Sequence, residues 1–309
     1  MNTNVVEQRL ISTYLQDDYL LVWIEAFLID RKAQNMSKGT IEFYQCKLKN
    51  FTNFCDARAV TNISQITPSL LREYLLDFER GHNPGGCHAA YRTVKTFMRW
   101  WEQEVEPKDW TNPINKVKAP KMSIEPLDPV DIGTVKAMMN VCLNNLTGMR
   151  DKALMLVLLD TGIRASELVS LNLEDINPIT GDILVRVGKG RKPRTVYLGS
   201  KSRKALRAYL KLRQDNSKAL WITDEGERIT YWGVKMLIQR RANQAHVKTP
   251  MLHAFRRFFA LTCLRAGMDV YSLKELMGHA DLQVLSRYLK QTNQDIREAH
   301  NRASPVDGF

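Results

Sequence analysis

Five residues between positions 164 and 288 have side chains that together could cut a phosphodiester bond without a metal ion. They are Arg164, His253, Arg256, His279 and Tyr288. Arginine grips two phosphate oxygens at once, histidine moves protons, and a phenol oxygen can attack phosphorus. Each residue alone has an ordinary interpretation, because an isolated His-x-x-Arg is usually a surface pair and most tyrosines are half-buried aromatics. Their order within one basic chain favours phosphodiester chemistry.

The charge balance indicates a polyanionic partner. The 309 residues include 45 Lys and Arg against 33 Asp and Glu, which gives a net charge of +12. This balance favours nucleic acid first and an anionic membrane second, with a merely soluble basic protein as the alternative. No stretch reaches the ~18 apolar residues of a membrane helix, and residues 1–19 are too polar for a signal peptide. We therefore expect a cytoplasmic protein and no membrane partner.

The cysteines form no metal-binding pattern. There are five of them, without a Cys-x-x-Cys pair, and the six histidines complete no zinc motif. We expect reduced, packed thiols, with no metal site and no cofactor.

A proline-rich segment divides the chain. Five of the eleven prolines fall between Pro107 and Pro129. Proline lacks a backbone donor and holds its predecessor extended, so residues 107–127 are predicted to be an interdomain linker. The predicted parts are an N-terminal domain at 1–106, this linker, a second domain at 128–292, and a tail at 293–309.

The N-terminal domain is predicted to be all-α. Apolar residues recur at helical spacing over 20–28 and 41–54, and Thr67-Pro68 begins a third helix. A fourth helix is expected over 89–101, after a breaker at 83–86. Basic residues on one face of this helix and in the linker are candidates for contact with DNA phosphates, although a solvated surface is an equal alternative. They are Arg92, Lys95, Arg99, Lys118 and Lys121.

The second domain is predicted to combine helices with a small antiparallel sheet. An apolar run at 152–159 indicates a buried helix that ends at Thr161-Gly162. The patterns at 182–187 and 195–198 predict two strands joined by a turn at 188–193. From Lys201 to the tail the pattern is helical. The fold class is therefore a two-domain protein, all-α followed by mainly α with a small sheet (α+β).

The predicted turn opens the most basic region of the chain. Residues 186–213 contain eleven Lys and Arg and no acidic residue. A charge run is usually a solvated face, but self-repulsion over this length favours neutralisation by a phosphate backbone. Glycines flank Lys189 and permit a mobile loop that carries the amine into a cleft. An amine beside other cations loses pKa and can protonate a leaving oxygen.

The sequence resembles the tyrosine recombinases, also called phage-type integrases, from about residue 17 to residue 295. The motifs are Thr-Gly-x-Arg-x-Ser-Glu-Leu at 161–168, Gly-Lys-Gly at 188–190, His-x-x-Arg-Arg at 253–257, Leu-Met-Gly-His at 276–279 and Arg-Tyr at 287–288. Domain sizes are similar to those of short Xer-type and transposon-encoded members. The resemblance implies a four-helix, SAM-like core-binding domain and a catalytic domain.

The resemblance also implies roles for individual residues. Tyr288 attacks a DNA phosphate, forms a 3′-phosphotyrosyl intermediate and frees a 5′-hydroxyl. Lys189 protonates the leaving oxygen, His253 assists proton transfer at the tyrosine, and Glu167 supports the site. Three groups hold the non-bridging oxygens: Arg164, Arg256 and His279. Further basic residues near the site are candidates for DNA contact: Arg191, Lys192, Arg194 and Arg257.

The predicted activity is site-specific strand exchange between two DNA duplexes, without metal or ATP. The expected partners are an inverted-repeat core site and three further copies of the chain in a tetramer, with the tail, through Ile296 and Ala299, docking on a neighbouring copy. Accessory DNA-bending or directionality proteins are further expected partners. Integration and excision of a mobile element is the favoured role, and Xer-type resolution of chromosome or plasmid dimers is the alternative. A type IB topoisomerase-like relaxer and a catalytically silent DNA-binding regulator are rival functions.

Overall fold

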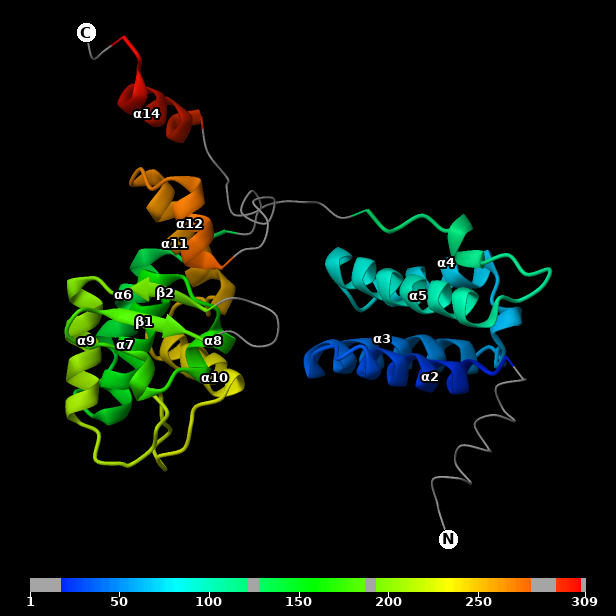
Figure 1. Ribbon diagram of the computed structural model, residues 1–309, viewed down its shortest axis with the longest axis horizontal. Helices are drawn as coiled ribbons and strands as arrows, with labels where there is room; N and C mark the ends of the chain where they lie inside the picture. Colours follow the sequence, from blue (N-terminus) through cyan, green and yellow to red (C-terminus); the bar gives the residue numbers. More distant parts are fainter. Residues whose placement is uncertain (1–17, 122–127, 187–192, 279–292, 307–309) are drawn as a thin grey trace. The chain divides into compact units, whose positions relative to one another are not determined.

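The computed structural model describes residues 18–121, 128–186, 193–278 and 293–306 and divides the chain into two compact units, residues 1–124 and 125–309 (Figure 1). The described helices of the first unit are α2 (Leu20–Ala33), α3 (Lys38–Asp56), α4 (Pro68–Glu79) and α5 (Pro84–Val105), with 3-10 turns η1 (Ile63–Gln65) and η2 (Pro113–Lys116). The four helices predicted for this region are confirmed.

Aromatic side chains fill the core of the first unit. Trp23 of α2 meets Trp100 and Trp101 of α5 edge to face, with ring centroids 6.1 and 6.3 Å apart. The helix α5 is longer than predicted, because the residues interpreted as a breaker form its start. Asn83 accepts a hydrogen bond from the Gly86 backbone at 2.8 Å, and Pro84 occupies the first turn.

The first half of the predicted linker at 107–127 packs on the N-terminal core. Asn112 is fully buried and donates to the Met98 carbonyl at 3.2 Å. Ile114 and Val117 are buried too, and the Val117 carbonyl accepts from the Tyr91 hydroxyl at 2.9 Å. The division between the units falls after residue 124, inside the predicted segment.

The second unit is mainly α with one small sheet, as predicted. Its described elements are α6 (Ile132–Asn140), α7 (Leu146–Thr161), α8 (Ala165–Ser170), η3 (Leu173–Asp175), β1 (Asp182–Val185), β2 (Arg194–Tyr197), α9 (Ser200–Lys211), α10 (Tyr231–Gln244), α11 (Leu252–Arg265), α12 (Val270–Met277) and α14 (Asn293–Ala303).

The apolar helix α7 lies at the centre of the second unit, where it packs against α6, α9 and α11 (Figure 1). The strands β1 and β2 pair antiparallel, with Asp182 opposite Tyr197 and Val185 opposite Arg194. The expectation of helices from Lys201 onward fails at 213–230, because this segment forms isolated β-bridges instead of a helix.

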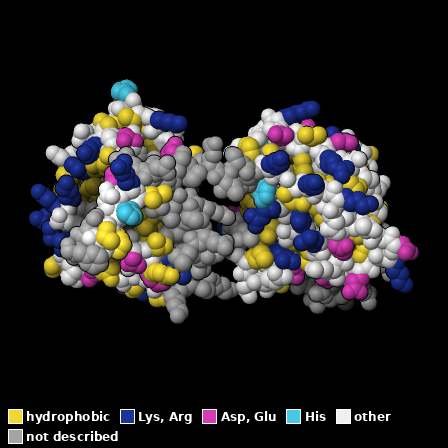
Figure 2. Space-filling model, turned by 90° about the horizontal axis from the view of Figure 1, so that it is seen from above, with side chains coloured by type: hydrophobic (Ala, Val, Ile, Leu, Met, Phe, Trp, Pro, Cys, Tyr) yellow, Lys and Arg dark blue, Asp and Glu magenta, His cyan; other side chains and the backbone are white. Residues whose placement is uncertain are grey.

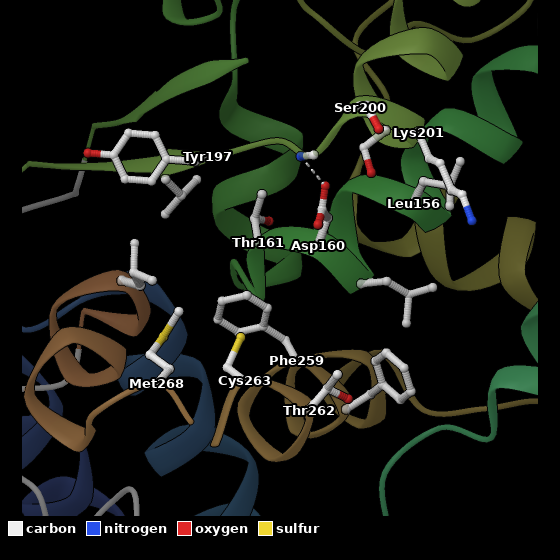
Figure 3. A pocket seen from close by; sticks show the side chains of 16 residues that line it. Leu156, Asp160, Thr161, Tyr197, Ser200, Lys201, Phe259, Thr262, Cys263 and Met268 are labelled. Atoms are coloured by element: carbon white, nitrogen blue, oxygen red, sulfur yellow. Dashed lines mark hydrogen bonds between the residues drawn. The ribbon is translucent and has the colours of Figure 1, made fainter. Parts of the chain in front are cut away.

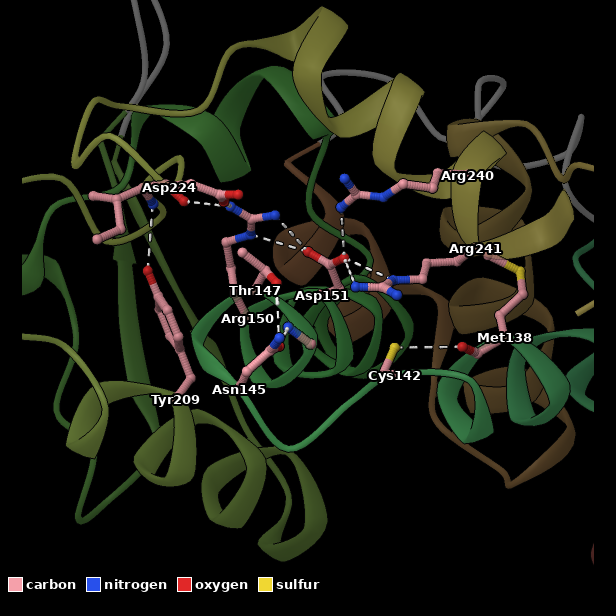
Figure 4. A network of polar contacts seen from close by, with 12 residues as sticks. Met138, Cys142, Asn145, Thr147, Arg150, Asp151, Tyr209, Asp224, Arg240 and Arg241 are labelled. Atoms are coloured by element: carbon pink, nitrogen blue, oxygen red, sulfur yellow. Dashed lines mark hydrogen bonds and ion pairs between the residues drawn. The ribbon is translucent and has the colours of Figure 1, made fainter. Parts of the chain in front are cut away.

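A buried carboxylate joins three parts of the second unit (Figure 4). Asp151 of α7 has no solvent exposure and accepts from Arg150 at 2.8 and 2.9 Å. Its second oxygen accepts from Arg241 at 2.8 Å and from Arg240 at 3.2 Å, both on α10. Arg150 also donates to the Ile222 carbonyl at 2.7 Å. The network therefore fixes α7, α10 and the segment before α10 to one another.

Among the described residues, no helix is both long enough and apolar enough to cross a membrane. The tail forms the helix α14, on which Ile296 is 54% exposed.

Candidate active site

The first catalytic arginine of the sequence prediction lies where two helices meet. The helix α7 ends at Gly162, whose φ of 59° ends the helical pattern, and Arg164 then caps α8. The backbone N–H of Arg164 donates to Glu167 at 2.8 Å, and its guanidinium donates to the other oxygen of that carboxylate at 2.9 Å. Glu167 thus fixes both the backbone and the side chain of Arg164.

The second predicted arginine, Arg256, is buried on α11 and reaches two other helix ends. Its Nη1 donates to the Gly162 carbonyl at 2.5 Å, and its Nη2 donates to the Met277 carbonyl at 2.5 Å. Only 2% of the residue is exposed. The ends of α7 and α12 are therefore held together through this guanidinium.

The C-terminal end of α12 accepts hydrogen bonds from three arginines. The carbonyls of residues 276, 277 and 278 accept, in that order, from Arg194 (Nε, 2.8 Å), Arg256 (Nη2, 2.5 Å) and Arg164 (Nη2, 3.4 Å). The last carbonyls of a helix have no partner within it and carry partial negative charge, so guanidinium groups are suitable donors. The described site is organised around this helix end.

Glu167 stays ionised in this environment. Burial by itself raises the pKa of Glu167, but hydrogen bonds from Arg194 and from the Arg164 backbone, together with both guanidinium charges, outweigh it and lower the pKa to about 2. The carboxylate therefore keeps its charge at every pH at which the protein would work.

His253 lies at the start of α11 with its side chain exposed. Partial burial of the ring, together with the positive charges of Arg256, Arg257 and Arg164, lowers the pKa of His253 below its usual 6.5. A histidine that is neutral at pH 7 can accept a proton, as the predicted role requires.

Several predicted residues lie outside the described residues, so the structure says nothing about them. They are Lys189, Arg191, Lys192, His279 and Tyr288.

Two residues predicted to contact DNA are instead buried. Arg194 is only 10% exposed in its side chain and donates to both oxygens of Glu167, at 3.1 and 2.8 Å. Arg257 is 6% exposed on α11. Both side chains are largely enclosed within the unit, and Arg194 is held there by Glu167.

Part of the one-signed run at 186–213 has acidic partners from outside the run. Arg186 pairs with Asp175, and Arg213 pairs with Asp215 at 2.5 Å. The exposed cations that remain in the described part of the run lie on α9: Lys201, Lys204, Arg207 and Lys211.

The basic residues predicted to bind DNA in the first unit are at its surface. Arg92 and Arg99 of α5 are exposed, and the Lys95 amine lies over the Tyr91 ring, 5.6 Å from its centroid. The opposite face of α5 is buried, as the spacing predicted. Lys118 and Lys121 are exposed as well. Figure 2 shows dark blue Lys and Arg side chains spread over the drawn face of this unit.

The second unit contains a pocket of about 580 Å³ between α7, α11 and the start of α9 (Figure 3). Its walls are mostly apolar, with Phe259 and Met268 among them. Asp160 lies on its polar side and accepts from the Gly199 backbone at 2.6 Å. Among the predicted catalytic residues that the structure describes, none lines this pocket, so we do not assign it to the chemistry.

Gly162 has a left-handed backbone conformation and leaves no room for a side chain next to Phe259. A Cβ there would lie 2.3 Å from Cδ1 of Phe259. We expect Gly162→Ala to lower the free energy of unfolding by about 2–4 kcal/mol, from backbone strain and from displacement of the ring. Urea unfolding measures this loss.

Gly267→Ala is the matched control, because it has a φ of +93° and no described atom within 4 Å of an added Cβ. It should show the backbone strain alone. Equal losses at Gly162 and Gly267 would mean that the contact with Phe259 does not limit the substitution.

Residues 131–295, more than half of the chain, match the model of the phage integrase family. The chain belongs to this family of tyrosine recombinases. The XerC tyrosine recombinase of Leptospira interrogans is 29% identical over 283 residues, which cover 88% of this chain and 89% of the relative. The XerC tyrosine recombinase of Oceanobacillus iheyensis is 29% identical over 302 residues, 93% of this chain and 96% of the relative.

A solved structure shares the tyrosine recombinase fold. The Tn1549 transposon integrase, in complex with a circular intermediate DNA, superposes with a TM-score of 0.74. The alignment covers 93% of this chain and 99% of that chain at 17% identity. The two-unit architecture of this tyrosine recombinase is therefore the architecture of a known integrase.

Proposed function

We propose that this tyrosine recombinase cleaves and rejoins DNA through a 3′-phosphotyrosyl intermediate on Tyr288. Arg164 and Arg256 bind the non-bridging oxygens of the attacked phosphate, and His279 adds a third donor. Lys189 protonates the 5′-oxygen that leaves, and His253 accepts the proton of the tyrosine.

The observation that carries this proposal is the convergence of Arg164 and Arg256 at the end of α12. Both side chains are held by backbone carbonyls at 2.5–3.4 Å, so their positions are set before a substrate binds. Donors that are already in place stabilise the charge that develops on a phosphate in the transition state. Arg164 keeps 24% of its side chain exposed, which leaves it accessible to that phosphate.

The partner in this proposal is double-stranded DNA with an inverted-repeat core site. The exposed cations of α5 and of residues 118 and 121 support it, because exposed Lys and Arg on one unit can follow a phosphate backbone. The working assembly is a tetramer on two synapsed duplexes, in the cytoplasm of a prokaryote, and the exposed Ile296 of α14 supports docking of the tail on a neighbouring copy. Accessory DNA-bending or directionality proteins complete the proposal.

The experiment uses a nicked DNA substrate from which the cleaved end is lost by diffusion. We expect the wild-type protein to accumulate a covalent adduct that survives denaturing electrophoresis. A second duplex with a free 5′-hydroxyl end should then receive the cleaved strand. An adduct that relaxes supercoils but never transfers its strand would favour the topoisomerase-like alternative, and the absence of any adduct would favour a silent regulator.

Integration and excision of a mobile element is the proposed biological role. Resolution of chromosome or plasmid dimers is the second candidate, because the XerC relatives cover 88–93% of this chain.

A further inference from the structure

Arg194 has every side-chain nitrogen engaged inside the second unit. Its Nη1 and Nη2 donate to the two oxygens of Glu167 at 3.1 and 2.8 Å, and its Nε donates to the Leu276 carbonyl at 2.8 Å. A guanidinium is planar, so when all three of its nitrogens donate hydrogen bonds it sets both the distance and the angle between the groups that it joins. Arg194 therefore joins Glu167 of α8 directly to the end of α12, beside the longer contact of Arg164 with the Gly278 carbonyl.

The carboxylate that Arg194 grips is the one that fixes Arg164. Glu167 is shared, since Arg164 donates to it through both its backbone and its side chain. Without Arg194, Glu167 would lose two of its hydrogen-bond donors and would be held by Arg164 alone among the partners described. The position of the Arg164 guanidinium thus depends on Arg194 through one intermediate residue.

Arg194 also contacts the C-terminal end of α12 and the glycine that follows it. The guanidinium packs directly on Gly278, where an added Cβ would be 2.9 Å from Nη1. The neighbouring carbonyl at Met277 holds Arg256, and His279 follows Gly278 in the chain. Arg194 also begins β2, directly after the segment that contains Lys189.

We propose that Arg194 is a positioning residue for DNA cleavage, which locks Glu167 and the end of α12 in register so that Arg164 and Arg256 meet the same phosphate. This inference rests on the proposed function, because it assigns Arg194 to the cleavage step. It replaces a direct contact between Arg194 and DNA.

The test compares Arg194→Lys and Arg194→Met with wild type on the nicked substrate. The rate of adduct formation is measured at saturating protein, and the dissociation constant for DNA is measured separately by fluorescence anisotropy. We expect both variants to cleave roughly 100-fold more slowly, since a misplacement of about 1 Å has effects of this size. The dissociation constant should change less than about 3-fold, because the side chain is buried. Lysine should not rescue the rate, since it carries the charge without the fork.

The pH profile gives a readout that a general loss of stability would not change. In wild type the pKa of Glu167 is about 2, so the rate should not depend on this group above pH 5. Without Arg194, its hydrogen bonds and positive charge no longer offset the effect of burial, so the pKa of Glu167 rises. The rate of Arg194→Met should therefore fall as the pH is lowered from 7 to 5, more steeply than that of wild type.

Arg203→Met is the matched control. Arg203 of α9 also donates to two backbone carbonyls, of Ile179 and Thr180 at 2.9 and 3.3 Å, but contacts no proposed catalytic residue among those described. It should cleave at the wild-type rate. Circular dichroism sets the folded fraction of each variant, and rates are compared per folded molecule.

The outcomes separate the two proposals. A wild-type protein that forms no adduct refutes the proposed function. If the wild-type protein forms the adduct, two results for Arg194→Met would refute the positioning role but not the proposed function. One is cleavage at the wild-type rate at saturating protein. The other is a weaker affinity for DNA with no change in the cleavage rate.

Discussion

Replacement of Tyr288 by phenylalanine is expected to abolish the covalent DNA adduct while DNA binding persists. The substitution removes one oxygen and keeps the aromatic ring, so packing and folding should change little. Removal of a nucleophile lowers the rate of a covalent step by about 10⁴-fold or more. The adduct should therefore be undetectable on a denaturing gel, whereas the gel shift of the noncovalent complex should match that of wild type.

Tyr271→Phe is the control for this experiment. Tyr271 lies on α12, in the same unit, and is 71% exposed. A hydroxyl lost there should leave the adduct intact. If the Tyr288→Phe protein still became trapped on DNA, the nucleophile would be a different residue.

Loss of the buried carboxylate at Asp151 is expected to destabilise the second unit strongly. Asp151→Ala would remove the buried carboxylate that Arg150 and Arg241 share, and both are only 6% exposed in their side chains. Removal of one partner from a buried ion pair typically lowers the free energy of unfolding by about 3–5 kcal/mol. Hydrogen exchange in urea, resolved to peptides of residues 128–278, measures the loss and separates it from unfolding of the first unit.

Asp224→Ala offers a comparison at the same arginine. Asp224 lies 3.5 Å from Arg150 but is 68% exposed. An exposed ion pair contributes about 0–1 kcal/mol, because water screens it. Similar losses for Asp151→Ala and Asp224→Ala would show that the buried network does not hold α7 and α10 together.

The helices could be predicted from local chemistry, and the linker could not. Thr67 caps α4 through its hydroxyl at 3.2 Å, and Gly162 ends α7 at a positive φ, as the residue types indicate. The prolines after residue 107 indicate only an irregular backbone. Whether such a segment packs depends on partners far along the chain, such as the Met98 carbonyl that Asn112 reaches. An isolated sequence pattern does not contain that information.

The roles of the charged residues show the same limit. The family resemblance implies one site for Arg164, Glu167 and Arg256, and the structure links Arg164 to Glu167 and brings both arginines to the end of α12. Arg194 was interpreted as a surface cation because it lies in a one-signed run. The alternation of side chains along a strand predicts the inward position of Arg194. It lies two residues before the buried Val196, so both side chains are on the same face of β2.

Asp151 was missed for a related reason. The apolar run at 152–159 predicts the helix α7, and the pair Arg150-Asp151 directly precedes that run. A charged pair within a buried helix indicates an internal ion pair, because isolated charges are rarely buried. The partners on α10 lie about 90 residues away in the sequence, so their identity needed the fold.

The three carbonyls at the end of α12 also matter for the charge that DNA would encounter. A peptide carbonyl can orient a guanidinium without neutralising it, whereas a carboxylate in the same place would cancel its charge and repel a phosphate. Arg256 is fixed in this way by the carbonyls of Gly162 and Met277. Backbone dipoles thus hold Arg256 in place without cancelling its charge, whereas Arg164 also pairs with the Glu167 carboxylate.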